Sequence, residues 1–171
     1  MPKYTIMPYT KIDGIPTIRD SQIADIYNKI FEDGIQDSFF YDGEVGSTAE
    51  WVHFIKSGKV ILWQLFCDDV PMGFCYFSEY TQASANCHFL VYKEFWGSGD
   101  ALPAGKNAMT EALKIFSTIT GMCPTTNRFA VRYLQNVGLK IIYDVPNALW
   151  SEKEGKAING TLLYITRKDS E

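Results

Sequence analysis

The middle of the chain carries three runs of apolar, β-branched and aromatic residues in close succession. They span residues 59–67 (KVILWQLFC), 72–80 (MGFCYFSEY) and 85–92 (ANCHFLVY). Such residues favour strands over helices, and the pair Asp68-Asp69 between the first two runs is typical of a tight turn. The sequence therefore predicts consecutive antiparallel strands at its centre, which excludes a purely helical architecture.

Segments with a helical period lie on both sides of these strands. Residues 19–33 place apolar side chains at i, i+3, i+4, i+7 and i+8, as in an amphipathic helix, and Asp20 or Ser21 can cap it. A second helix is expected to open at Ser47 and Glu50, which have capping-box spacing. The segments with helical spacing after the first are residues 47–58, 104–118 and 127–138.

The remaining segments complete a mixed architecture. Further strands are expected at residues 121–126, 139–145 and 161–167, with an additional one at 4–10 and a loop at 37–46. A chain of 171 residues is long enough for one domain with a full core. The predicted fold class is α/β (α+β), a single domain with a mixed sheet of six or seven strands flanked by about four helices.

Composition excludes several classes of function. The net charge is −4 and the lysines and arginines are scattered, so no nucleic-acid surface is expected. No apolar run approaches the roughly 20 residues of a membrane span, and the start lacks the features of a secretory signal. The four cysteines form no CxxC pair and no Cys/His metal pattern, so we expect reduced thiols, no metal and a cytoplasmic protein.

A glycine-rich segment follows the third central run. Residues 93–105 read KEFWGSGDALPAG, and a glycine-rich turn between a strand and a helix is a common way to bind phosphate through backbone N–H groups. An acidic residue, Asp100, stands in the middle of this turn, where a phosphate would repel it.

Two segments on this framework resemble the GNAT superfamily of acyl-CoA-dependent N-acyltransferases. The family's phosphate loop reads Gln/Arg-x-x-Gly-x-Gly/Ala before a helix, and residues 96–101 (WGSGDA) match its glycine and its final small residue. The family's fourth helix reads Asn-x-x-Ala/Ser, with Gly-Phe eleven residues after the Asn. The residues in that register are Asn127, Ala130, Val131, Gly138 and Leu139. The ribosomal-protein and amino-acid acetyltransferase branch is the most similar, and the resemblance covers about residues 19–167.

The resemblance implies a site for acetyl-CoA. The diphosphate would lie on the backbone of the loop, the pantetheine arm along a splayed strand edge, and the motif asparagine would reach the arm from the next helix. The residues implied in cofactor binding are Leu90, Val91, Tyr92, Trp96, Gly97, Ser98, Gly99, Asp100, Ala101, Leu102 and Asn127. A backbone N–H near Val91 would stabilise the thioester oxyanion.

The resemblance also implies a proton acceptor for the attacking amine. His88 lies close to where many members carry a glutamate, and an imidazole suits this role, although a half-buried structural histidine is the alternative. Glu79 at the end of the preceding strand is a second candidate, with a solvated carboxylate as its alternative. Many members use a tyrosine as the acid at the position of Leu134. Tyr133 is adjacent but turned by about 100° around the helix, so it acts as the acid or packs in the core.

The loop departs from the family pattern in ways that bear on activity. Trp96 replaces the usual Gln or Arg, and Pro103 removes an N–H group where donors are wanted. Asp100 can cap the following helix and would then occupy N–H groups that a phosphate needs, which argues against catalysis.

Two functions follow from these features. The first is an acetyl-CoA-dependent N-acetyltransferase acting on an amine of a small molecule or a protein, whose acceptor site Phe39, Phe40 and Tyr41 would line, unless they form an apolar plug under the loop. The second is a catalytically inactive interaction or assembly module of the same fold, with a protein partner or a homodimer. An unrelated α/β fold with accidental motif matches is the third alternative.

Overall fold

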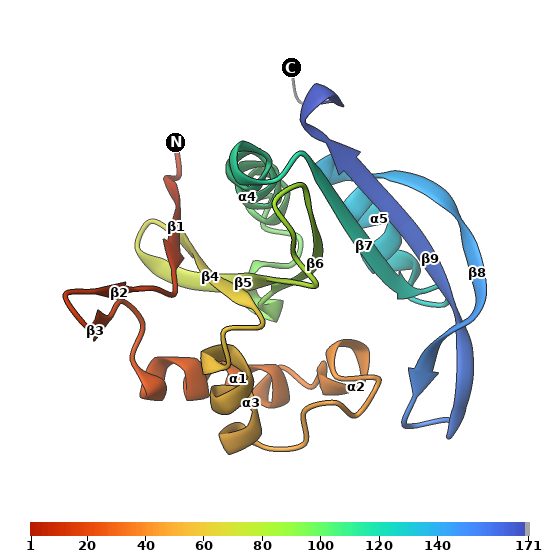
Figure 1. Cartoon of the computed structure of the whole chain (residues 1–171), viewed down its shortest axis with the longest axis horizontal. Coiled ribbons are helices and arrows are strands. Elements are labelled where there is room, and N and C mark those ends of the chain that lie inside the picture. Colours follow the sequence, from red (N-terminus) through yellow and green to blue (C-terminus); the bar gives the residue numbers. More distant parts are fainter. Residues whose placement is uncertain (170–171) are drawn as a thin grey trace.

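The computed structural model describes residues 1–169, and a twisted seven-stranded sheet forms its centre (Figure 1). Every neighbouring pair is antiparallel except β6 and β7, which run parallel. In sheet order the strands are β1 (Tyr4–Pro8), β4 (Ile61–Cys67), β5 (Val70–Ser78), β6 (Ser84–Val91), β7 (Thr118–Pro124), β9 (Lys156–Thr166) and β8 (Lys140–Ser151). The short strands β2 (Lys11–Ile12) and β3 (Ile15–Pro16) form a separate hairpin.

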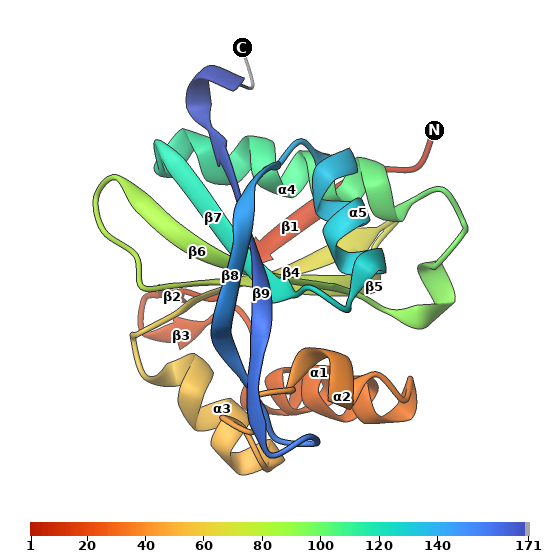
Figure 2. The same ribbon diagram turned by 90° about the vertical axis from the view of Figure 1, so that its right-hand side faces the viewer.

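Helices cover both faces of the sheet, as Figure 2 shows. The first face carries α1 (Asp20–Glu32), α2 (Gln36–Phe39) and α3 (Thr48–Lys56), and the opposite face carries α4 (Ala101–Ile115) and α5 (Arg128–Val137). Two short 3₁₀ turns, η1 (Lys93–Phe95) and η2 (Arg167–Asp169), complete the described elements. None of the helices in this part of the chain is long and apolar enough to cross a membrane.

Two hydrophobic cores lie on opposite faces of the sheet. Successive strand residues point to opposite faces, so Cys75 and Phe77 pack toward α4 while Phe74 and Tyr76 pack toward α1 and α3. The indole of Trp51 is fully buried in the second core, and its Nε1 donates to the carbonyl of a residue in α1 at 3.0 Å. The sheet is therefore a layer between two helical layers, as the sequence predicts.

Three local features predicted from sequence are confirmed, one tight turn and two helix caps. Asp68 and Asp69 have φ angles of 47° and 66° in a two-residue turn between β4 and β5, which is the geometry of a tight hairpin. Ser47 caps α3 by accepting from the N–H of Glu50 at 3.2 Å. Gly138 ends α5 with φ of 126°, a conformation that favours glycine.

Several predicted boundaries are wrong. The helix expected at 104–118 spans Ala101–Ile115, because Phe116 has extended backbone and begins the connection to β7. The N-cap of α1 is Arg19 and neither Asp20 nor Ser21, since the Gln22 side chain accepts from the Arg19 N–H at 2.9 Å. The loop expected at 37–46 overlaps the short helix α2, and β8 and β9 extend well beyond the ranges predicted for them.

Candidate functional site

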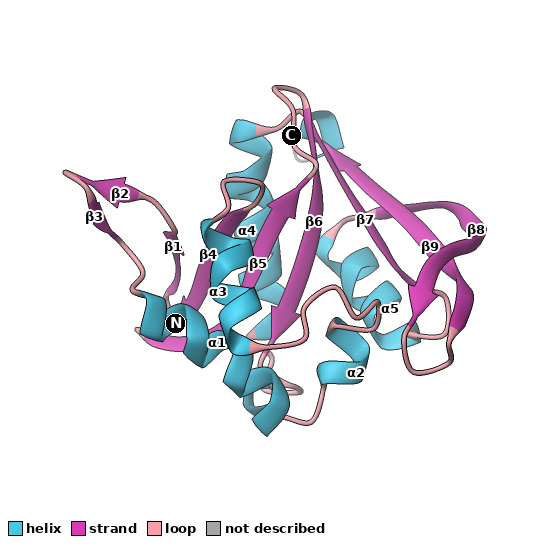
Figure 3. Cartoon of the chain, turned by 60° about the horizontal axis from the view of Figure 1, so that its bottom comes forward, coloured by secondary structure: helices cyan, strands magenta, loops and turns pink. Residues whose placement is uncertain are grey.

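The parallel strands β6 and β7 diverge after a short paired stretch. Their register runs only from Ser84 opposite Thr118 to Asn86 opposite Thr120. Beyond it the strands separate, and Figure 3 shows β6 and β7 splaying toward the end that faces α2 and α5. The Tyr92 N–H donates to the Met72 carbonyl of β5 at 2.8 Å. In an antiparallel pair, the backbone groups of successive residues point alternately toward the partner strand and away from it. This alternation turns the N–H and C=O groups of alternate β6 residues, Cys87, Phe89 and Val91, toward the gap.

A cavity of about 630 Å³ fills this gap. It has walls from both strands, the glycine-rich loop, α2 and α5. The lining residues are Ile35, Ser38, Phe39, Tyr41, Cys87, His88, Phe89, Leu90, Val91, Trp96, Gly97, Ala101, Met122, Cys123, Pro124, Asn127, Phe129, Ala130, Tyr133 and Leu134. A volume of this size suits an extended, largely apolar small-molecule segment.

The glycine-rich loop offers unused backbone donors at the mouth of the cavity. Gly97 and Gly99 have φ angles of 77° and 91°, and a Cβ on either would meet no atom within 4 Å, so their surroundings are open. Within residues 1–169 the N–H groups of Gly97, Gly99, Ala101 and Leu102 have no hydrogen-bond acceptor. Pro103 stands in the first turn of α4, where its missing N–H breaks no helical bond. Free donors at a helix N-terminus are suited to bind an anion.

Asp100 does not occupy these donors. It precedes α4 with φ of −83° and ψ of −27°, and its side chain accepts nothing from the helix backbone. Its Oδ1 accepts from the Tyr4 hydroxyl of β1 at 2.8 Å. The expected competition between the Asp100 carboxylate and a phosphate for the N–H groups of the helix is therefore absent from this structure.

Trp96 closes the loop onto the end of β6. Its Nε1 donates to the Val91 carbonyl at 2.8 Å, while 54% of the residue remains exposed. The indole is apolar where the resemblance implies a Gln or Arg side chain. Its N–H satisfies the Val91 carbonyl on the cavity side of β6. The N–H of Val91 is left facing the gap.

Of the two predicted proton acceptors, the structure places His88 on the cavity wall. Burial lowers the pKa of His88 to about 4, although the negative charge of Asp42 acts in the opposite direction. Its Nε2 lies 3.0 Å from Ser78 Oγ and 3.3 Å from Asn86 Nδ2. An amide nitrogen can only donate, so Nε2 is the acceptor and the neutral ring carries its proton on Nδ1. His88 is unprotonated at neutral pH.

Glu79 lies outside the cavity lining. It is exposed and has φ of 48° just after β5. Glu79 belongs to a group of three carboxylates with Asp42 and Glu44. The pKa of Glu44 is raised mainly by burial, and the negative charges of Asp42 and Glu79 raise it further. The side of the cavity near these carboxylates is therefore electronegative.

Helix α5 contributes Asn127, Tyr133 and Leu134 to the lining. The Asn127 Oδ1 caps the helix by accepting from the Ala130 N–H at 3.2 Å. The Tyr133 hydroxyl donates to the Ala101 carbonyl at 2.7 Å, and burial raises the pKa of this phenol. Tyr133 thus ties α5 to the start of α4, and Leu134 presents an apolar surface at the position where the resemblance in sequence implies an acid.

Not every predicted residue reaches the cavity. Phe39 and Tyr41 line it, whereas Phe40 packs against Trp51 and Tyr27 in the core, as the plug interpretation requires. Tyr92 does not line the cavity, because it is buried in the core that α1 and α3 form with the sheet. Ser98, Gly99, Asp100 and Leu102 belong to the loop and the first turn of α4 without lining the cavity.

Several lining residues were not predicted from sequence. Ile35 caps the short helix α2 and Ser38 lies within it, in the segment that the sequence pattern indicated as loop, and Met122, Cys123 and Pro124 come from β7. The predicted strand at 121–126 places these residues in the sheet, but nothing local in the sequence shows that the neighbouring strand moves away and exposes them to a cavity. No group of three or more His, Cys, Asp or Glu side chains within residues 1–169 could hold a metal ion.

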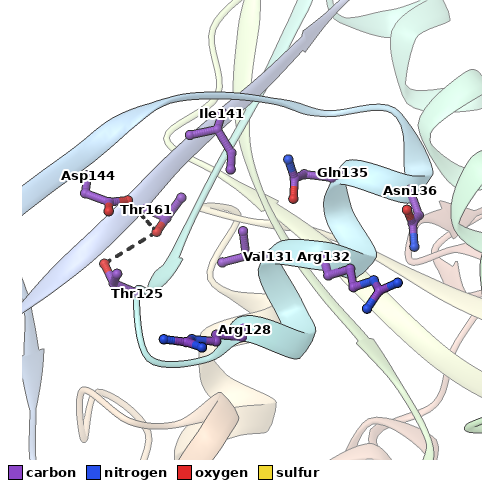
Figure 4. A pocket seen from close by; sticks show the side chains of 9 residues that line it. All are labelled: Thr125, Arg128, Val131, Arg132, Gln135, Asn136, Ile141, Asp144 and Thr161. Carbon is purple, nitrogen blue, oxygen red and sulfur yellow. Dashed lines mark hydrogen bonds between the residues drawn. The ribbon is translucent and has the colours of Figure 1, made fainter.

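A second cleft of about 670 Å³ lies on the other side of α5 (Figure 4). Arg128, Val131 and Gln135 of α5 face a hydrogen-bonded pair on the β8–β9 hairpin, in which Thr161 Oγ1 donates to Asp144 Oδ1 at 2.7 Å. None of the residues predicted for the site lines this cleft. The predicted site residues that line a cavity therefore all lie at the one between β6 and β7.

The sequence matches no protein-family model and no curated protein. Solved structures are nevertheless similar in fold. RimL, a ribosomal L7/L12 α-N-protein acetyltransferase in complex with coenzyme A, superposes with a TM-score of 0.73 at 13% identity, over 90% of this chain and 92% of that chain. The spermidine N-acetyltransferase from Vibrio cholerae in complex with CoA and spermine has a TM-score of 0.74 at 14% identity, over 97% and 96% of the two chains.

A GNAT-family acetyltransferase from Streptococcus pneumoniae gives a TM-score of 0.66 at 16% identity, covering 96% of this chain and 99% of that chain. The similarities cover nearly the whole chain. They show that it has the GNAT fold, which confirms the fold expected from the two sequence motifs.

Proposed function

We propose that this protein is a cytoplasmic acetyl-CoA-dependent N-acetyltransferase that modifies an amine of a small molecule or of a protein. The observation that carries the proposal is the cavity between the diverging strands β6 and β7, with a loop of unoccupied backbone donors at its mouth. RimL and the Vibrio cholerae enzyme, both similar in fold, are described in complex with CoA.

The residues present fit this cofactor. The N–H groups of Gly97, Gly99, Ala101 and Leu102 would hold the diphosphate, since they have no acceptor within residues 1–169. The backbone edge at Phe89 would pair with an amide of the pantetheine arm, and Asn127 stands on the facing wall. Bound there, acetyl-CoA supplies an acetyl group activated as a thioester.

The chain's own groups would then serve the transfer. The Val91 N–H faces the gap and is the donor proposed for the oxyanion, because a backbone donor fixed in place stabilises the negative charge that develops there. His88 is the proposed proton acceptor. Its neutral form has a lone pair on Nε2, whereas burial raises the pKa of Tyr41 to about 12 and that of Cys123 to about 11 and keeps both protonated.

Proton transfer to His88 requires a local rearrangement. Ser78 Oγ and Asn86 Nδ2 both approach Nε2, so both groups must move away before an amine can reach its lone pair. The low pKa makes the imidazolium costly to form, and the carboxylate of Asp42 offsets part of that cost. Tyr133 is not proposed as the acid, because its hydroxyl is already donated to Ala101.

The acceptor would enter from the side of α2. Phe39 and Tyr41 line that end of the cavity, and the carboxylates of Asp42 and Glu44 lie near it. An electronegative entrance attracts a protonated amine. Formation of a homodimer stays a prediction, which light scattering coupled to size-exclusion chromatography would test.

The proposal is tested by thermal unfolding in the presence of CoA, acetyl-CoA and pantetheine. A ligand at about 100 times its Kd adds about 2.7 kcal/mol to the free energy of unfolding, so a clear rise in Tm is expected with both coenzyme forms. Release of free CoA is then followed with spermidine and with a short peptide bearing a free N-terminus. The absence of any shift at millimolar CoA would contradict the proposal and favour an inactive interaction module.

A further inference from the structure

The carboxylate of Asp100 is held by a residue at the other end of the sequence. Tyr4 lies in β1, the edge strand of the sheet, which packs beside α4 (Figure 2). Its hydroxyl donates to Asp100 Oδ1 at 2.8 Å, and its carbonyl accepts from Asn107 Nδ2 of α4 at 3.4 Å. The two contacts place the tyrosine ring along the start of α4.

Without this contact Asp100 would have a different local partner. An aspartate before a helix normally accepts from the N–H of the second or third helical residue. The third residue of α4 is Pro103, which has no N–H, so the Leu102 amide is the one that Asp100 would take once its ψ moves from −27° to the extended region usual for a capping residue. That amide is one of the four donors left free at the mouth of the cavity.

We propose that Tyr4 is a positioning residue that holds the Asp100 carboxylate away from the N-terminus of α4 and so keeps the loop's amides free for the diphosphate of the cofactor. This inference rests on the proposed function. The contact also reduces repulsion, because the hydroxyl donates to the carboxylate and the carboxylate is directed toward β1. The hydrogen bond to Asp100 raises the pKa of Tyr4 to about 12, so Tyr4 keeps its proton and remains a donor at neutral pH.

The first test needs no ligand. In Tyr4→Phe the ring and its packing remain but the donor is lost, and Asp100 is expected to turn and cap α4. Hydrogen exchange of the Leu102 amide, followed by NMR, should slow by about 10-fold in Tyr4→Phe, as for a newly formed hydrogen bond of about 1.4 kcal/mol. It should not slow in Tyr4→Phe/Asp100→Ala. Unchanged exchange of Leu102 in Tyr4→Phe would overturn the inference.

The second test measures CoA affinity by titration calorimetry. Tyr4→Phe should weaken CoA binding by about 10-fold and leave pantetheine binding unchanged, because pantetheine lacks the diphosphate. In the Asp100→Ala background the same substitution should change CoA affinity by less than about twofold. An equal weakening in both backgrounds would show that Tyr4 acts through the stability of β1, which contradicts the inference.

Tyr80→Phe is the matched control. The Tyr80 hydroxyl donates to the Gly58 carbonyl at 2.8 Å, so this substitution also removes a tyrosine hydrogen bond, but one that involves neither the loop nor α4. It should alter neither Leu102 exchange nor CoA affinity. If the unmodified protein binds no CoA, the proposed function fails, and the ligand-free exchange measurement still decides whether Tyr4 directs Asp100.

Discussion

The imidazole of His88 stacks on the ring of Tyr76, with centroids 4.3 Å apart and planes inclined by 10°. The two residues are directly paired between β5 and β6, so both side chains project to the same face of the sheet. Tyr76 is buried on the side of α1 and α3. His88 packs against it in the same apolar environment, which disfavours a positive charge on the imidazole. The stack therefore connects the stability of the fold to the protonation state of the site.

Stability should fall in mildly acid solution because of His88. Its pKa is about 4 in the folded chain, against an ordinary value of 6.5. The unfolded state therefore binds the additional proton between these values, and the free energy of unfolding decreases as the pH falls from about 6.5 to about 4. The contribution of this group is on the order of 3 kcal/mol. Chemical denaturation of His88→Gln should show a shallower pH dependence in this window, whereas the exposed His53→Gln should keep that of the unmodified protein.

Substitution of His88 should reduce activity much more than substitution of Glu79. His88→Gln is expected to lower kcat for acetyl transfer by about 100-fold, the usual contribution of a proton-transfer group, with little change in CoA affinity. Glu79→Gln should leave kcat nearly unchanged, because Glu79 is exposed and outside the cavity lining. Steady-state kinetics decides between them. A larger loss in Glu79→Gln than in His88→Gln would reverse the assignment.

Filling the cavity should abolish cofactor binding without unfolding the protein. Ala130 lines the cavity from α5 and is only partly buried, so Ala130→Trp would place an indole in the space between the strands. We expect at least about a 100-fold loss of CoA affinity, measured by calorimetry, because a bound arm and the indole cannot share the volume. Ala49→Trp on the exposed surface of α3 is the control and should bind CoA as before.

Gly105→Ala should destabilise the protein although it lies inside a helix. Alanine in place of an exposed helical glycine normally stabilises by about 1 kcal/mol. Here a Cβ would overlap the Tyr133 hydroxyl and lie 2.8 Å from Val137 Cγ2. We expect a net loss of roughly 1–3 kcal/mol in urea denaturation, the usual cost of overpacking. Tyr133→Phe in the same background should recover part of this loss, and a stabilised Gly105→Ala would show that α5 moves freely relative to α4.

Asp69→Gly should stabilise the hairpin between β4 and β5. Asp69 has φ of 66°, a region that glycine occupies without steric cost. We expect a net gain of about 0.5–1 kcal/mol in the free energy of unfolding, because relief of the strain at positive φ exceeds the freedom that glycine adds to the unfolded chain; it would be seen as a higher urea midpoint with the same slope. Asp68 should not be replaced in this test, because its Oδ1 accepts from the Lys3 N–H at 2.8 Å and its loss would remove a contact to the chain segment before β1.

Sequence reasoning located most of the fold because its signals are local. The change from a period of two to a period of 3.6 separates the strands from the helices, and Asp68-Asp69, Ser47 and Gly138 act through their own backbone or immediate neighbours. The ranges were less accurate at the helix containing Pro103 and at the β8–β9 hairpin, where pairing between distant strands extends the elements.

The sequence by itself determined the order of the longer elements and the positions of the glycines that open the loop, but not the short elements β2, β3 and α2. Only the tertiary structure decided whether that loop can bind an anion. Asp100 has a good local capping partner, yet it is directed elsewhere by Tyr4, which is 96 residues away along the chain. Likewise, β6 and β7 separate after Asn86 and Thr120 although both remain regular strands. Such features depend on how remote segments pack, and no pattern within a few residues encodes that packing.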